Sequence, residues 1–154
     1  MDALAELLAR TVDELTRIQA SDEGLGEWRQ PRGFLGLKPK PSIVPVGRAW
    51  RLGVVLLSRD ATLFATGEVT RAVEPLVAVT NRSAEAERKR DLRRAAVRGK
   101  WPEGETINVG FTRILSVSDE PLSLGEGEIL VRLASGSRVP LERYLADRVS
   151  LFEL

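Results

Sequence analysis

The longest uninterrupted run of apolar residues, from Leu52 to Leu57, places the strongest constraint on the fold. It reads Leu-Gly-Val-Val-Leu-Leu, so a strand built from it needs cover on both faces. The run is far shorter than the roughly 18 apolar residues that a transmembrane helix requires. It therefore predicts a buried strand, over residues 48–58, in a sheet that other elements cover.

Three more strands are expected from similar patterns. A turn at 58–61 leads into a second strand over 62–72, and the short connection makes an antiparallel hairpin. Residues 105–117 alternate as a third strand whose phase then breaks, which indicates a bulge. Residues 128–134 form a fourth. The stretch 73–81 fits either a short strand or a buried loop.

Three helices complete the predicted set. Residues 2–20 carry a leucine-rich stripe at helical spacing, and Asp2 is suited to cap that helix. A second helix spans 83–98, with Ser83 as its cap and Gly99 as its end. Pro140 is suited to the first position of a last helix.

The expected order is therefore α-β-β-α-β-β-α. This order predicts an α+β fold with a mainly antiparallel, four- to five-stranded sheet covered by about three helices. The length of 154 residues fits a single domain over 1–154. Its parts are an amphipathic helix at 1–20, an arm at 21–47 and an α+β core at 48–154.

The arm is rich in proline and glycine. Residues 21–47 hold four prolines and five glycines, which argues against a helix or a central strand there. Trp28, Phe34, Leu35 and Leu37 give the segment apolar anchors. We therefore expect either a mobile linker or a partly ordered arm that wraps the core.

Composition excludes several kinds of chemistry. The chain has no Cys and no His, so thiolate nucleophiles and histidine bases or metal ligands are missing. It has no S-x-x-K motif and no phosphate-binding P-loop; Gly24-Leu25-Gly26 lacks the third glycine of a dinucleotide fingerprint. No cofactor, no metal site and no membrane partner are expected. The acidic N-terminus does not fit a signal peptide, which favours a cytoplasmic protein.

Charge is unevenly distributed along the chain. Residues 82–100 carry eight basic and three acidic side chains, whereas residues 101–154 carry five basic and nine acidic ones. Arg90, Arg94 and Arg98 recur every four residues, so they lie along one edge of the predicted helix. This basic helix predicts a surface that binds nucleic acid or a small phosphoanion.

A plainer interpretation of the same helix is a solvated face. Glu85–Lys89, Glu87–Arg90 and Asp91–Arg94 have the spacing of local ion pairs. No aromatic residue lies among the arginines, as a stacking platform for single strands would require. Trp101, just past the helix, is expected to anchor the core.

Arg71 is a separate candidate at the end of the second strand. By strand parity it shares a face with Val69 and Leu63, so it is an inward-pointing cation that needs a carboxylate or a bound anion as partner. The alternative is a strand-end arginine whose head group reaches water.

Three stretches together resemble an uncharacterised family of short actinobacterial proteins: Trp50–Val54 with Gly67–Ala72, Leu92–Gly99 with Gly104–Thr106, and Val139–Leu145. The resemblance covers about residues 46–152. Members are sometimes labelled glutaminase, but this chain has neither the S-x-x-K serine nor the cysteine that such enzymes use. The resemblance therefore implies no activity.

The sequence favours a non-catalytic domain that acts by binding or by self-association, with a homodimer as the expected oligomer. The runner-up is a nucleic-acid or phosphoanion-binding module that uses residues 82–100, with Arg71, Arg90, Arg94 and Arg98 as candidate binding residues. A third possibility is an enzyme that works through carboxylates.

Overall fold

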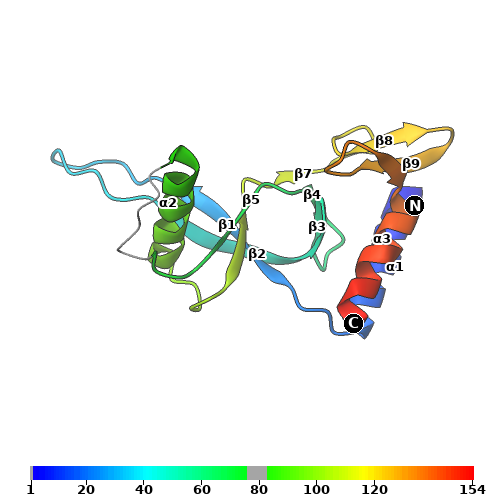
Figure 1. The fold of residues 1–154 in the computed structure, drawn as a ribbon, viewed down its shortest axis with the longest axis horizontal. Coiled ribbons are helices and arrows are strands. Elements are labelled where there is room, and N and C mark those ends of the chain that lie inside the picture. Colours follow the sequence, from blue (N-terminus) through cyan, green and yellow to red (C-terminus); the bar gives the residue numbers. More distant parts are fainter. Residues whose placement is uncertain (1, 76–82) are drawn as a thin grey trace. The chain divides into compact units, whose positions relative to one another are not determined.

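The computed structural model describes residues 2–75 and 83–154. The chain divides into two compact units. Unit 1 comprises Met1–Asp22, Ala49–Thr66 and Phe111–Leu154, and unit 2 comprises Glu23–Arg48 and Gly67–Gly110. Each unit has sheet strands and at least one helix (Figure 1). No helix in the described ranges is long and apolar enough to cross a membrane.

Unit 1 combines two helices with two antiparallel sets of strands. The first set runs in the order β2-β3-β4-β7 and the second in the order β10-β9-β8. Its elements are α1 (Ala3–Arg17), the end of β2 (Ser42–Leu52), β3 (Val55–Leu57), β4 (Leu63–Ala65), β7 (Thr112–Arg113), β8 (Leu122–Gly125), β9 (Glu128–Arg132), β10 (Arg138–Pro140), α3 (Leu141–Ser150) and a short 3-10 helix (Leu151–Glu153).

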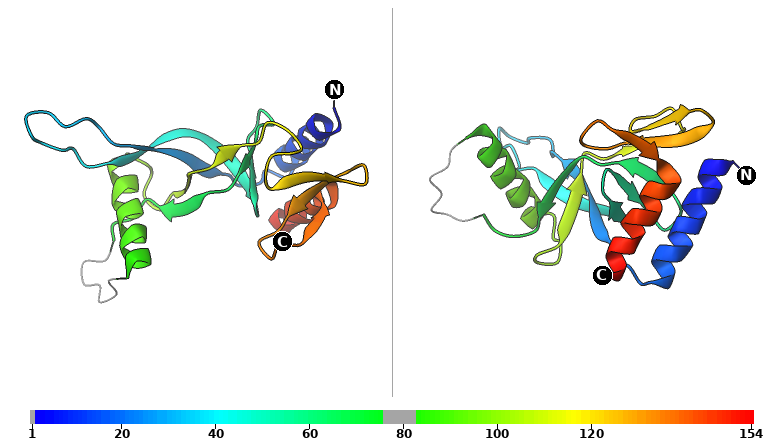
Figure 2. Two further views of the ribbon diagram at one scale, coloured as in Figure 1. Left: turned by 90° about the horizontal axis from the view of Figure 1, so that it is seen from above. Right: turned by 45° about the vertical axis from the view of Figure 1, so that its right-hand side comes forward.

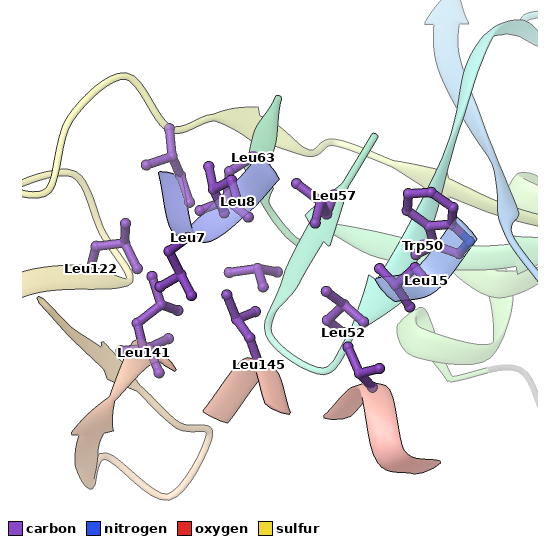
Figure 3. Close-up of a cluster of buried hydrophobic side chains, with 14 residues drawn as sticks. Leu7, Leu8, Leu15, Trp50, Leu52, Leu57, Leu63, Leu122, Leu141 and Leu145 are labelled. Carbon is purple, nitrogen blue, oxygen red and sulfur yellow. The ribbon is translucent and has the colours of Figure 1, made fainter. Parts of the chain in front are cut away.

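The core of unit 1 forms where the helices meet the strands. The leucine stripe of α1 packs with α3 and with the apolar strand run, and Leu15, Leu52 and Leu145 are almost completely buried (Figure 3). Trp50 is 1% exposed, and its indole Nε1 donates to the Ala20 carbonyl at 2.9 Å. The hydrogen bond satisfies the polar end of an otherwise apolar side chain.

Unit 2 is a mixed sheet with one helix against it. The strands run in the order β5-β6-β1-β2: β5 (Glu68–Arg71), β6 (Thr106–Val109), β1 (Glu23–Arg29) and the first part of β2. β1 is parallel to β6, whereas β5 is antiparallel to it. Helix α2 (Ala84–Arg98) buries Leu92, Ala95 and Ala96 against this sheet (Figure 2).

The α+β class and the three helices are confirmed. Asp2 caps α1 by accepting from the Ala5 amide, and Ser83 caps α2 by accepting from the Ala86 amide. Gly99 ends α2, and Trp101 packs against the core of unit 2 and donates to the Ile43 carbonyl at 2.8 Å. Each of these expectations came from a short-range pattern or from a large apolar side chain.

The strand predictions were wrong in detail. The described residues form ten strands, not four or five. The apolar run turns back at Gly53 and Val54 and so belongs to both β2 and β3. The strand expected over 62–72 is divided into β4 and β5, and the one expected over 105–117 into β6 and β7. The expectation of no central strand in 21–47 was also wrong, since β1 lies between β6 and β2. Part of the stretch 73–81, and Arg82, fall outside the described residues.

The glycines of β1 explain why a glycine-rich strand can be central. A Cβ on Gly24 would lie 2.4 Å from the Trp101 ring, and one on Gly26 would lie 2.4 Å from the Ile43 side chain. Side chains from neighbouring elements therefore fill the space that β1 leaves. The Gly24-Leu25-Gly26 triplet is a packing feature.

Candidate anion-binding groove

The basic groove of unit 2 is lined by residues of α2, of β1 and of the segment just before β2. Its volume is about 520 Å³, and its lining residues are Trp28, Lys40, Pro41, Arg88, Asp91, Arg94 and Arg98. Four of these side chains are cationic and one is anionic. The groove therefore presents a surplus of positive charge around one indole ring.

Local ion pairs order part of α2. Lys89 pairs with Glu85, Arg90 with Glu87, and Arg94 with Asp91 at 3.3 Å, which confirms the three predicted pairs. Apart from the Arg90 side chain, which is 12% exposed, the side chains of these pairs are about half exposed or more, so each pair stabilises the helix only weakly.

Arg88 connects α2 to two strands. Its guanidinium lies 5.5 Å from the centre of the Trp28 ring and donates to Glu68 at 2.9 Å. The hydrogen bond from Arg88 lowers the pKa of the Glu68 carboxyl and raises the pKa of Arg88. Trp28 is thus held beside the helix by a cation–π contact, and 39% of it stays exposed.

Arg98 and Lys40 also line the groove. The Arg98 Nε donates to the Pro41 carbonyl at 2.6 Å, which ties the helix end to the hairpin. Lys40 is exposed and has no ion pair among the described residues. One arginine with a fixed direction and one unpaired lysine are suited to hold an anion between them.

The Glu68–Arg88 pair gives a pH-dependent contribution to stability. A carboxyl whose pKa is lowered by folding stabilises the protein above its unfolded pKa, and this contribution is lost as the pH falls through the lower folded pKa. Because both side chains are about half exposed, we expect Glu68→Gln to cost a few tenths of a kcal/mol at pH 7. Urea unfolding of the wild type and of Glu68→Gln at pH 7 and pH 3 measures this loss of stability. Glu126→Gln, a substitution at an exposed turn position, is the control.

The structure brings together two of the predicted site residues. Arg94 and Arg98 line the groove, whereas the Arg90 side chain is 12% exposed, pairs with Glu87 and does not line it. Arg71 is exposed, and its Nε and Nη2 donate to the Gly104 carbonyl at 3.4 and 3.3 Å. Of the two possibilities for Arg71, the structure has the strand-end arginine that reaches water and not the inward-pointing cation, because Arg71 and Val69 lie on the exposed face of β5.

Trp28 and Lys40 were missed as site residues. The available signal was the charge of the arm: residues 28–48 hold five basic side chains and no acidic one. The aromatic residue that the basic helix lacks in sequence comes from β1. Strand pairing and the Arg88 contact, not sequence proximity, bring it to α2.

No metal centre accompanies the groove: within 2–75 and 83–154, no group of three or more acidic side chains could hold a metal ion. Comparisons with protein-family models, with curated proteins and with solved structures found no match to this chain. The proposals below therefore depend on the geometry alone.

Proposed function

We propose that unit 2 binds single-stranded nucleic acid in the basic groove, without catalysis. The observation that carries this proposal is the position of Trp28, which is exposed among Lys40, Arg88, Arg94 and Arg98. Single-strand sites combine a positively charged groove for the backbone with an aromatic ring on which a base stacks. The groove has both components.

The roles of the side chains follow from their contacts. Lys40 and Arg94 lie at the surface, so they contact phosphates, and Arg98 is directed by its bond to Pro41. Arg88 is held by Glu68 and orients the indole. A small phosphorylated molecule would use the cations but would gain less from an open aromatic surface. Trp28 therefore favours a strand with bases.

Removing Trp28 tests the stacking role. We expect Trp28→Ala to weaken binding of a fluorescein-labelled oligothymidylate of about 15 nucleotides by about 5- to 150-fold, since stacking on one aromatic contributes about 1–3 kcal/mol. Fluorescence anisotropy at fixed salt measures this. Trp28→Phe should retain most of the affinity. Unchanged affinity in Trp28→Ala, or no binding by the wild type at low salt, contradicts the proposal.

The same titrations over a salt series test the cations. The slope of log K against log salt should fall by about 1.4 in Lys40→Gln/Arg94→Gln, at about 0.7 per phosphate contact. Arg98 is left intact because it also binds Pro41. The exposed pair Arg113→Gln/Arg143→Gln removes the same charge in unit 1 and should barely change the slope.

Equal decreases of the slope in the two double variants would show a nonspecific charge effect. Competition by AMP as strong as by the oligonucleotide would show a small-anion site.

A further inference from the structure

The tip of the β1–β2 hairpin exposes three large apolar side chains. Phe34, Leu35 and Leu37 are 75%, 85% and 73% exposed. Phe34 and Leu37 exchange two backbone hydrogen bonds of 3.0 Å, which close a tight turn. Leu35 and Gly36, at its centre, have φ values of 52° and 76°. This is a type I′ turn, in which Asn-Gly is favoured, so a bulky leucine is held outward at an unfavourable backbone position.

Cations surround this apolar tip. Arg32 and Lys38 flank it, both are exposed, and neither has an ion pair among the described residues. No acidic residue occurs between positions 28 and 48. The tip therefore matches a surface that is apolar at its centre and acidic at its edge.

Unit 1 has a groove of this kind between its two helices. Its volume is about 350 Å³, and α1 and α3 lie side by side along it (Figure 2). Its apolar lining consists of Leu7, Leu145 and Val149, which are buried in the core of unit 1, and of the exposed Ala146; Thr11 and Ser150 also line it.

The rim of that groove is acidic. It has three carboxylates, from Glu14, Glu142 and Glu153, and one lining cation, Arg10. Arg10 lies 3.8 Å from Glu142, and the nearby Arg17 contacts Glu14 and Glu153. The carboxylates still outnumber the two arginines. The rim thus has the charge opposite to that of Arg32 and Lys38.

We infer that the hairpin tip of one copy docks into the α1–α3 groove of a second copy. The leucines and Phe34 would contact the apolar lining, and Arg32 and Lys38 would lie near the acidic rim. Because the two surfaces differ, the contact is head-to-tail and can extend to chains or close into a ring. This inference is independent of nucleic-acid binding, since the tip does not line the basic groove.

The first test is the mass in solution. Sedimentation of nuclease-treated protein should show a weight-average mass that rises with concentration from about 10 µM upward, since contacts below standard size are weak. Leu35→Asp, at the exposed tip, and Ala146→Lys, at an exposed helix position in the groove, should each stay at the mass of one chain. Leu115→Asp, which changes another exposed leucine, should associate like the wild type.

Mixing the two blocked variants tests the direction of the contact. Leu35→Asp retains an intact groove and Ala146→Lys retains an intact tip, so the mixture should form a one-to-one dimer and nothing larger. A wild type that stays at the mass of one chain, association that survives Leu35→Asp, or a mixture that does not dimerise overturns the inference. A wild-type protein that stays at the mass of one chain but sediments with phosphatidylserine vesicles through Leu35 would also overturn it and identify the tip as a lipid contact. Leu35→Asp should leave oligothymidylate affinity unchanged, which separates this test from that of the proposed function.

Discussion

Gly99→Ala should destabilise unit 2 by about 3 kcal/mol or more. Gly99 has a helical backbone conformation, with φ of −78°, so alanine is conformationally acceptable and would ordinarily be mildly stabilising. A Cβ at this position, however, would lie 1.6 Å from the Ile43 carbonyl oxygen. This oxygen belongs to the backbone and also accepts a hydrogen bond from Trp101. The clash can therefore be relieved only if the end of α2 moves away from β2. The hydrogen bond would be lost as well.

Gly47→Ala is the matched control. A Cβ there would meet only the Leu25 side chain, at an ordinary 3.6 Å. Thermal unfolding followed by tryptophan fluorescence should show a fall in Tm of more than about 10 °C for Gly99→Ala and little change for Gly47→Ala. Because Arg98 precedes Gly99 and binds Pro41, oligothymidylate binding should weaken in the same variant. Equal Tm values for the two alanine variants would contradict the close contact between α2 and β2.

Asn108→Asp should cost about 3–5 kcal/mol at neutral pH. Asn108 is completely buried in β6, and its Nδ2 donates to Glu23 at 3.0 Å and to the Gly24 carbonyl at 3.3 Å. Its Oδ1 has no partner in the described part of the chain. The substitution replaces a donor by a buried carboxylate that faces a second carboxylate. A buried charge that has no compensating partner costs about this much free energy of unfolding.

The pH dependence distinguishes charge from shape. Burial beside Glu23 raises the pKa of the introduced carboxyl above its unfolded value, so the penalty is absent below about pH 4 and grows as the pH rises. Asn108→Leu, of similar size and without charge, should show a smaller loss with no comparable dependence on pH. Urea unfolding at pH 4 and pH 7 makes the comparison. A loss for Asn108→Asp that is the same at both values would show that packing, not charge, dominates.

The helices could be predicted because their signals are local. A cap, a glycine stop and an ion pair three or four residues apart involve neighbours in the chain, so Asp2, Ser83, Gly99 and the Glu85–Lys89 pair were identified correctly. The strands could not be counted in this way. The apolar run at 52–57 shows that a sheet is buried, but its turn at Gly53 depends on pairing with another segment.

The arm shows the limit most clearly. Gly24 and Gly26 weaken a strand on its own, and yet β1 is central because the Trp101 ring and the Ile43 side chain occupy the space beside them. Trp101 and Ile43 lie outside β1 in the sequence, so the residue pattern within β1 gives no sign of the space that their side chains occupy. The same holds for Arg71. Strand parity grouped it with Val69 and Leu63, but Leu63 is buried on β4, whereas Val69 and Arg71 lie on the exposed face of β5.

The fold class, the three helices, the local pairs of α2 and the lack of histidine and cysteine chemistry could be predicted from the chain alone, because they depend on composition and short-range spacing. The folded protein was needed to show that Trp28 and Lys40 join Arg94 and Arg98 in one groove, whereas Arg90 and Arg71 do not. Strand pairing places β1 beside β6, and the Arg88–Trp28 contact holds the ring against α2. A binding surface assembled across some 70 positions of sequence depends on such contacts, and these form only when the chain folds.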